Sequence, residues 1–249
     1  MKTFGGLFKE SLKEYGDKFI PILKIFVVSY LFIAFLGAIM LLLFIPIFWL
    51  GEIVNLFTFR GNFSDLIKNS LGQGEGFFSI YGLLFLIIFL VILLVIVFAQ
   101  ASYFYIALSK KKNPLLREIF NNAKKYFWKY IALSIVLSFF LFFLYLALII
   151  PGIIFSVYWI FAFYILISEN KGIMDSLRRS KEIVKGRWWK VFGFLALMVL
   201  IIFGTSFILA FIPFIGQIFS SLVITPFAIL FFKNFYIEMK NLKISKRKK

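Results

Sequence analysis

Long apolar segments alternate along the chain with shorter segments that are rich in lysine and arginine. The apolar segments are each near 20 residues long, which is the length that an α-helix needs to cross the hydrocarbon core of a bilayer. We expect six such spans, at about 25–45, 79–108, 129–150, 152–168, 191–212 and 216–237. Thr225-Pro226 predicts a kink in the last of them. Because the alternating polar pattern of a transmembrane barrel is absent, the sequence predicts an all-α, polytopic integral membrane protein.

Three further segments combine an apolar face with a charged face at helical spacing. The first covers residues 3–18 and the third covers about 172–186. The second begins at Asn113-Pro114, a favourable pair for the N-cap and the first helical position. We therefore expect three amphipathic interfacial helices. Ion pairs at i,i+4 are expected on the third, joining Asp175 with Arg179 and Arg178 with Glu182.

One long polar loop is expected between the first two spans, at residues 51–76. It includes a possible short helix near Phe63–Leu71 and ends in the glycine-rich run 72–76. The spacing of these glycines does not fit a phosphate-binding or dinucleotide-binding loop, so we interpret the run as a linker.

The charged residues are distributed unevenly along the chain. All but two of the 28 lysines and arginines lie in four segments: 1–24, 110–129, 171–190 and 233–249. The other two, Arg60 and Lys68, lie in the long loop. The positive-inside rule then predicts a multi-pass protein of the plasma membrane with both termini and all three amphipathic helices in the cytoplasm. This topology accounts for the net charge of +17 without a nucleic-acid partner.

An internal threefold repeat is predicted by four sequence markers that recur in the same order. These are a Leu-Lys or Leu-Arg pair, a lysine 12 or 13 residues after its leucine, an Ile-Pro pair 22 or 23 residues further on, and Phe-Tyr-Ile. The prolines are Pro46, Pro151 and Pro213, and the last marker begins at Phe104, Phe163 and Phe235. We expect one helical membrane domain, 1–249, with units near 1–109, 110–170 and 171–241 and a basic tail at 242–249. Turns and interface anchoring explain the markers, and a ligand role for them is the alternative.

Two residue types that are common in catalytic sites are missing. The chain contains no cysteine and no histidine, which excludes disulfides, thiolate chemistry and imidazole ligands. No spacing singles out a pair of carboxylates or a Ser-Lys arrangement. We therefore expect a non-enzymatic protein without a metal site or a cofactor.

Two polar residues near the spans are candidates for a binding site. Glu169 and Gln100 are candidates for a polar or ion-binding site. The alternative for Glu169, and for Glu238, is an ion pair with a lysine or arginine of a neighbouring amphipathic helix. For Gln100 and the serine and threonine residues of the spans, the alternatives are a transport pathway and hydrogen bonding between packed helices.

A basic region around the third amphipathic helix is the candidate for contact with lipid headgroups. It consists of Arg178, Arg179, Lys185, Arg187, Trp188, Trp189 and Lys190. Basic amphipathic helices beside tryptophan are typical of membrane surfaces with anionic lipid. The alternative is a helix packed beneath the bundle with its charges in solvent, and the two arrangements are compatible.

A known family has a similar pattern in this region. Pro151-Gly152, Glu169, Gly172, Ser176-Leu177, Arg179-Ser180 and the run 185–189 (Lys-Gly-Arg-Trp-Trp) resemble a motif of polytopic prokaryotic membrane proteins. The family is that of the membrane domain of some glycerophosphoryl diester phosphodiesterases and of its stand-alone relatives. The resemblance implies a helical membrane domain without the phosphodiesterase activity, because the soluble catalytic barrel has no place in this chain.

These observations favour a non-enzymatic membrane module that engages anionic lipid, organises a membrane partner protein, or does both. The alternative is a transporter or permease for a lipid-like or apolar solute, with a cavity lined by Gln100 and the serine and threonine positions.

Overall fold

The computed structural model describes residues 2–58, 74–212 and 215–247, and these residues contain helices and no strand. They divide into two compact units. The large unit comprises Met1–Phe26 and Phe98–Lys249, and the small unit comprises Val27–Val97. Helices α2 (Phe19–Thr58) and α4 (Gly74–Leu108) each contribute to both. The expected all-α class is confirmed for the described residues.

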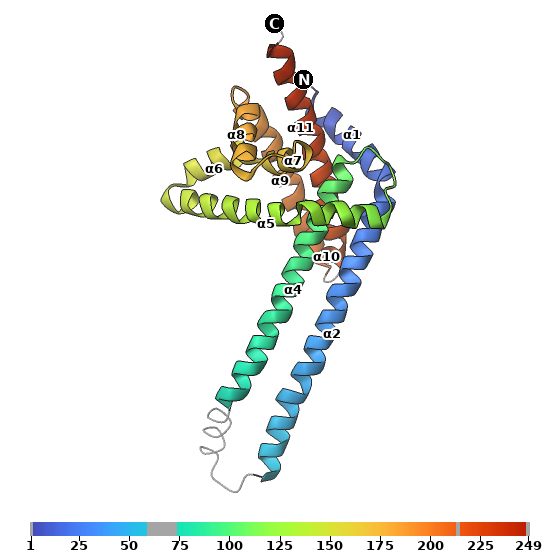
Figure 1. Cartoon of the computed structure of the whole chain (residues 1–249), viewed down its shortest axis with the longest axis vertical. Helices are drawn as coiled ribbons and strands as arrows, with labels where there is room; N and C mark the ends of the chain where they lie inside the picture. The colour runs from blue at the N-terminus through green and yellow to red at the C-terminus, as the bar shows by residue number, and fades with distance from the viewer. Residues whose placement is uncertain (1, 59–73, 213–214, 248–249) are drawn as a thin grey trace. The chain divides into compact units, whose positions relative to one another are not determined.

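The large unit contains the other helices (Figure 1). They are α1 (Phe4–Asp17), α5 (Leu116–Ala147), α6 (Ile149–Trp159), α7 (Ala162–Ser168), α8 (Ile173–Val184), α9 (Trp188–Ala210), α10 (Ile215–Phe219), the π-helical η1 (Ser220–Ile224) and α11 (Thr225–Arg247). Helix α1 packs on α11, α6 packs on α5, α8 and α9, and α7 packs on α5 and α8. Helix α5 runs across the direction of α11 (Figure 1).

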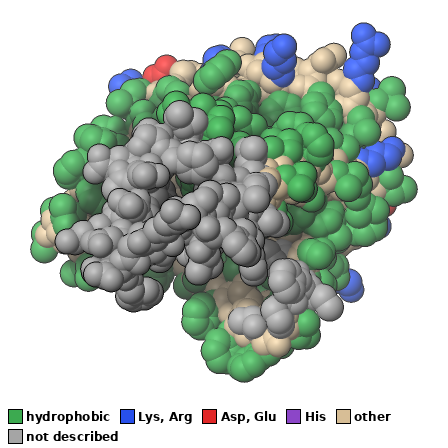
Figure 2. Space-filling model, turned by 90° about the horizontal axis from the view of Figure 1, so that it is seen from below, with side chains coloured by type: hydrophobic (Ala, Val, Ile, Leu, Met, Phe, Trp, Pro, Cys, Tyr) green, Lys and Arg blue, Asp and Glu red, His purple; other side chains and the backbone are tan. Residues whose placement is uncertain are grey.

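Six segments of the described helices are long and apolar enough to cross a membrane, as the sequence predicts. They are Phe19–Leu42, Gly82–Leu108, Leu116–Ala147, Ile149–Ser168, Trp188–Leu209 and Ser220–Lys243. Their side chains are largely exposed: Leu31, Phe142 and Leu200 are each more than 60% accessible. Hydrophobic side chains cover most of the described surface in Figure 2, with lysine and arginine at its margin. Such a surface indicates a membrane-embedded protein.

The helices that contain the first two spans extend beyond the predicted spans into the expected loop. Helix α2 continues through Pro46 to Thr58, and α4 already begins at Gly74. A proline removes one backbone hydrogen bond from a helix without always ending it, and apolar residues continue on both sides of this one. Residues 51–58 and 74–76 of the expected loop are therefore helical. The possible helix at Phe63–Leu71 lies outside the described residues.

The second amphipathic segment and the third span form a single helix, α5. Its N-cap is Leu115, in an extended conformation and without a side-chain capping bond, so Asn113-Pro114 is not the cap. Lys129 lies inside α5 instead of dividing two helices. Between Leu116 and Ala147 no glycine or proline interrupts the helix, so nothing local ends it.

The turn before the fourth span lies at Leu148 and not at Pro151-Gly152. Leu148 is extended (φ −159°, ψ 130°) and α6 begins at the next residue. Pro151 falls in the first turn of α6, where a backbone N–H has no helical partner to lose. Gly152 has a separate role. A Cβ at this position would lie 2.5 Å from Cδ1 of Tyr145, so glycine allows α5 and α6 to approach closely.

The sixth span carries a π-helical segment directly before the expected kink. The Thr225 N–H donates to the Ser220 carbonyl, five residues back. Pro226 has no N–H for the carbonyl of Leu222, which instead accepts a hydrogen bond from the Tyr15 hydroxyl at 3.2 Å. The irregular backbone is thus supported by α1, a helix more than 200 residues away in sequence.

The three Phe-Tyr-Ile segments contribute to one aromatic core in the large unit. The ring of Phe104 lies 4.9 Å from that of Tyr164, and Tyr164 stacks on Tyr236 at 6.0 Å. Burial of these rings stabilises the junction of α4, α7 and α11. The threefold repeat and the interfacial position of the amphipathic helices stay predictions.

Candidate functional site

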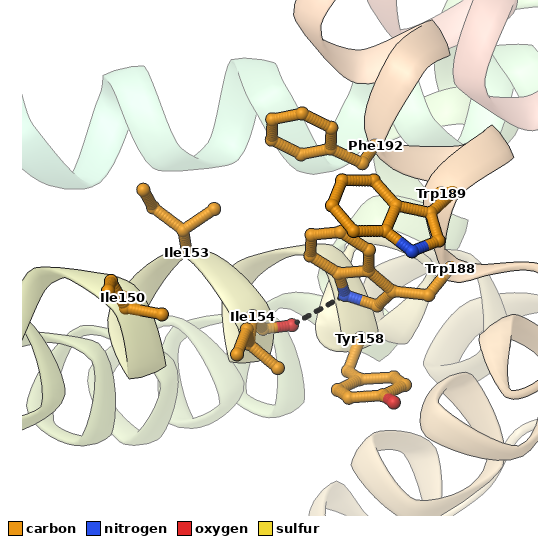
Figure 3. A pocket seen from close by; sticks show the side chains of 7 residues that line it. All are labelled: Ile150, Ile153, Ile154, Tyr158, Trp188, Trp189 and Phe192. Atoms are coloured by element: carbon orange, nitrogen blue, oxygen red, sulfur yellow. Dashed lines mark hydrogen bonds between the residues drawn. The ribbon is translucent and has the colours of Figure 1, made fainter.

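An apolar groove of about 500 Å³ lies between α6 and α9 (Figure 3). Its lining residues are Ile150, Ile153, Ile154 and Tyr158 from α6 and Trp188, Trp189 and Phe192 from α9. The two helices follow different sequence signals. Helix α6 starts after the Leu148 turn, and α9 starts after a turn in which Gly186 adopts a positive φ of 84°.

Trp188 is fixed in one wall of the groove. Its indole Nε1 donates to the carbonyl oxygen of Ile154 at 3.3 Å, the bond that Figure 3 shows as a dashed line. Its ring stacks on Phe192 with the two planes 7° apart. Trp189 meets Trp188 edge to face at 4.8 Å and is 77% exposed. One tryptophan therefore shapes the groove, while its neighbour presents an apolar ring to the surroundings.

One lysine, Lys181, lies against a residue of the groove, and three further cations are close in sequence to its tryptophans. Lys181 Nζ lies 5.4 Å from the ring of Phe155 and 5.6 Å from that of Tyr158, which lines the groove. Lys185 and Lys190 are exposed and Arg187 is half-buried. Among the described residues, no carboxylate lies within salt-bridge distance of these four cations. Their charge is therefore available to an anionic ligand.

Arg178 and Arg179 lie apart from the groove lining. They line a polar recess of about 220 Å³ with Lys171, Asp175 and Glu182. Arg179 Nη1 pairs with Glu182 Oε2 at 2.9 Å, an i,i+3 contact, so the expected i,i+4 pairing partners are wrong for Arg179. Arg179 is engaged with protein carboxylates, whereas Arg178 is exposed.

Glu169 at the end of α7 is ion-paired. Its carboxylate accepts from Lys240 Nζ and from the Tyr236 hydroxyl, each at 2.9 Å, and lies 3.5 Å from Lys171 Nζ and 4.0 Å from Arg179 Nε. Burial alone would raise the pKa of Glu169, but the hydrogen bonds from Lys240 and Tyr236 outweigh it and the pKa is lowered. The ionised carboxylate joins α7, α8 and α11, and its oxygens are occupied by these partners.

Gln100 lies in a different place, a second cavity of about 400 Å³ in the large unit. The Tyr130 hydroxyl donates to Gln100 Oε1 at 3.1 Å. Ser220 and Thr225 also line this cavity, and Glu169 does not. The structure therefore does not bring the two predicted polar candidates into one site.

Sequence reasoning missed a buried polar cluster between α1 and α11. Glu14 accepts from Lys233 Nζ at 2.6 Å and from Lys18 Nζ at 2.9 Å. Asn234 Nδ2 donates to Glu14 and to Ser11 Oγ, each at 3.0 Å. The available signal was Lys233-Asn234, a polar pair inside an apolar run near the end of the chain.

No family model matches the chain, and neither a curated protein nor a solved structure is significantly similar to it. The resemblance to the membrane domain of glycerophosphoryl diester phosphodiesterases therefore stays a prediction.

Proposed function

We propose that the protein is a non-enzymatic integral membrane module that binds an anionic phospholipid at the groove between α6 and α9. The observation that carries the proposal is the placement of Lys181, which has no carboxylate partner among the described residues, beside an apolar groove of about 500 Å³. This volume lies within the range of about 300–1,000 Å³ that is usual for small-ligand sites.

The two parts of a phospholipid match the two parts of this site. The apolar walls can pack against an acyl chain, and in lipid this contact is favoured by dispersion and packing, because no apolar surface leaves water. An anionic headgroup gains about 1 kcal/mol from each lysine or arginine near the membrane surface. Trp189, with its exposed ring, fits the interfacial belt in which tryptophan is enriched. The same surface can also hold a membrane partner protein, which mass spectrometry after native extraction would detect.

Binding of phosphatidylglycerol and of phosphatidylcholine to the purified protein, compared by native mass spectrometry, tests the proposal. We expect phosphatidylglycerol to bind more tightly. The triple substitution Lys181→Gln, Lys185→Gln and Arg187→Gln should lower its affinity by about 100-fold, since each cation contributes about 1 kcal/mol. Binding of phosphatidylcholine should change little.

A matched control removes three exposed cations elsewhere, with Lys110→Gln, Lys124→Gln and Lys125→Gln. This variant carries the same net charge as the first and should keep the preference for phosphatidylglycerol. Equal binding of the two lipids by the parent protein would refute the proposal. An equal loss in both triple variants would show a general charge effect instead of a site.

A second candidate function, transport of a lipid-like or apolar solute, is favoured by the cavity at Gln100. The sequence predicts that a carrier would have a cavity lined by Gln100 and by serine or threonine, and this cavity includes Ser220 and Thr225. A carrier must first bind its solute, so the ligand chemistry of the cavity decides whether this candidate is viable.

A further inference from the structure

We propose that the cavity lined by Gln100 and Ser220 binds a neutral amphiphile whose head group is a hydrogen-bond acceptor, such as an ester carbonyl. This is the cavity named for the second candidate function, so the inference rests on that candidate. The groove between α6 and α9 is a separate site. The two cavities share no lining residue.

The walls of the cavity are mainly apolar and come from most of the large unit. Phe104 is on α4, Phe163 on α7, Ile202 on α9, Ile224 on η1 and Phe232 on α11. A volume of about 400 Å³ is suited to a small ligand or to part of a lipid. The aromatic and branched side chains favour an apolar ligand body, because burying its surface removes it from water or from looser contacts.

Two hydrogen-bond donors on the cavity wall have no protein partner among the described residues. Gln100 Oε1 is engaged by the Tyr130 hydroxyl, which orients the amide and leaves its Nε2 hydrogens available. The Ser220 hydroxyl is also without a partner there. By contrast, the hydroxyls of Thr225 and Tyr164 donate to the carbonyls of Ser220 and Ile229. The cavity therefore offers donors to a ligand that can accept.

Charge argues for a neutral ligand. The lining residues include no lysine, arginine, aspartate or glutamate. An ionised group buried among these walls would have no counter-charge, and the cost of removing an unpaired charge from water is large. Fatty acid anions and anionic phospholipids are thus disfavoured here, which is the reverse of the chemistry at the groove.

The backbone that carries Ser220 is unusual in a way that fits a binding site. Ser220 begins the π-helical segment η1, and its carbonyl accepts from both the N–H and the hydroxyl of Thr225. π-Helical turns occur frequently at functional sites, because the widened turn changes the direction of nearby side chains. Here Ser220, Ile224 and Thr225 all line the cavity.

The test uses a photoreactive monoacylglycerol with a diazirine in its acyl chain, added to the purified full-length protein. After irradiation, we expect labelled peptides that contain cavity residues such as Phe104, Ile202 or Phe232. Unlabelled 1-oleoylglycerol should compete, whereas oleate and phosphatidylglycerol should compete at least 10-fold less well.

Variants separate the site from general lipid contact. Ser220→Ala should weaken labelling about 3- to 10-fold, as expected for one hydrogen bond, while Ser221→Ala, next to it and outside the lining, should not. Ala228→Phe should fill the cavity and abolish labelling, while Ala196→Phe on α9 should not. Thermal unfolding of each variant shows whether it is folded.

Failure of this inference can be distinguished from failure of the function proposed for the groove. Labelling that survives in a folded Ala228→Phe variant, or that oleate competes as strongly as 1-oleoylglycerol, overturns the inference. If either result is found and the parent protein still prefers phosphatidylglycerol, the function proposed for the groove stands. If phosphatidylglycerol binding fails while neutral labelling follows the expected pattern, only the cavity site stands.

Discussion

Lys18 and Glu14 show how single charged residues are accommodated inside this protein. The Lys18 ammonium is 5% exposed and donates to Glu14 and to the carbonyls of Ile106, Ala107 and Ser109, each at 2.9 Å. Those carbonyls lie at the end of α4, where helix carbonyls lack helical partners and the helix dipole favours a cation. Lys18 therefore acts as a cap that joins α1 to α4.

Glu14 should make stability depend on acid pH. Burial alone would raise its pKa, but the hydrogen bonds from Lys233 and Lys18 outweigh burial and the pKa is lowered from 4.5. A carboxylate with a lowered pKa stabilises the folded state fully above its ordinary pKa and loses this contribution as the pH falls through the folded value. We expect thermal stability in detergent to fall below about pH 4.5, and Glu14→Gln to be about 2 kcal/mol less stable at pH 7.

The matched control for this prediction is Glu10→Gln on the same helix. Glu10 pairs with Lys2 at 2.7 Å, but both side chains are close to half exposed, so the pair contributes little. Glu10→Gln should leave the melting temperature at pH 7 nearly unchanged. If the Glu14→Gln variant keeps the acid dependence of the parent protein, another group controls it.

The sequence could predict only part of the Glu14 cluster. Helical spacing places Glu14 on the charged face of residues 3–18 and Ser11 on the apolar face. Their shared partner, Asn234, is more than 200 residues away, and helical spacing says nothing about which distant helix packs on α1. Gln100 was a better case, because a lone amide inside an apolar run is visible without knowledge of the packing.

At the scale of elements, the fourth span is two helices, α6 and α7, with an irregular turn between them. Ser180 of α8 supports this turn by donating to the Tyr158 carbonyl at 2.7 Å and accepting from the Phe161 N–H at 3.2 Å. Phe161 and most of α7 are buried. Irregular backbone inside a membrane-embedded protein requires such partners, because lipid offers none.

Substitution of Ser180 tests this support. Ser180→Ala should destabilise the protein by about 2–4 kcal/mol. It leaves the Tyr158 carbonyl and the Phe161 N–H without a hydrogen-bond partner, and each such buried group costs about 1–3 kcal/mol. Ser134→Ala is the control, because the Ser134 hydroxyl donates only to the Tyr130 carbonyl within the continuous helix α5. That change should cost less than about 1 kcal/mol. Equal losses of thermal stability in the two variants would contradict the role of Ser180.

Helix ends were harder to predict than helices. A span is identified by its run of apolar residues, and that run can continue past a proline. Pro46 therefore does not end α2, and Pro151 lies inside the first turn of α6. The break at Phe161 carries no proline or glycine at all. It depends on the Ser180 hydroxyl from another helix, and no local pattern reports such a tertiary contact.

At the scale of the whole molecule, the four basic segments are linked by ion pairs within the large unit. Segment 1–24 contacts segments 110–129 and 233–249, and segment 171–190 also contacts 233–249. The pairs are Asp17 with Lys112 at 3.2 Å, Glu14 with Lys233 at 2.6 Å and Glu182 with Lys243 at 3.6 Å. Contacts of this kind require the linked residues to lie on the same side of a membrane, which supports the sequence-based prediction that one face carries nearly all of the positive charge.

This arrangement leads to a prediction about topology that the lack of cysteine makes easy to test. Lys110 and Lys185 are exposed and belong to two of the linked basic segments. The positive-inside rule assigns them to the cytoplasm and assigns Lys68, outside the described residues, to the other side. A membrane-impermeant maleimide should therefore label Lys68→Cys in intact cells, and Lys110→Cys and Lys185→Cys only in inverted membranes.

Labelling after denaturation controls for expression. Labelling of Lys110→Cys and Lys185→Cys from opposite sides would contradict the predicted single basic face. It would also contradict the cytoplasmic position expected for the cations near the proposed lipid-binding groove.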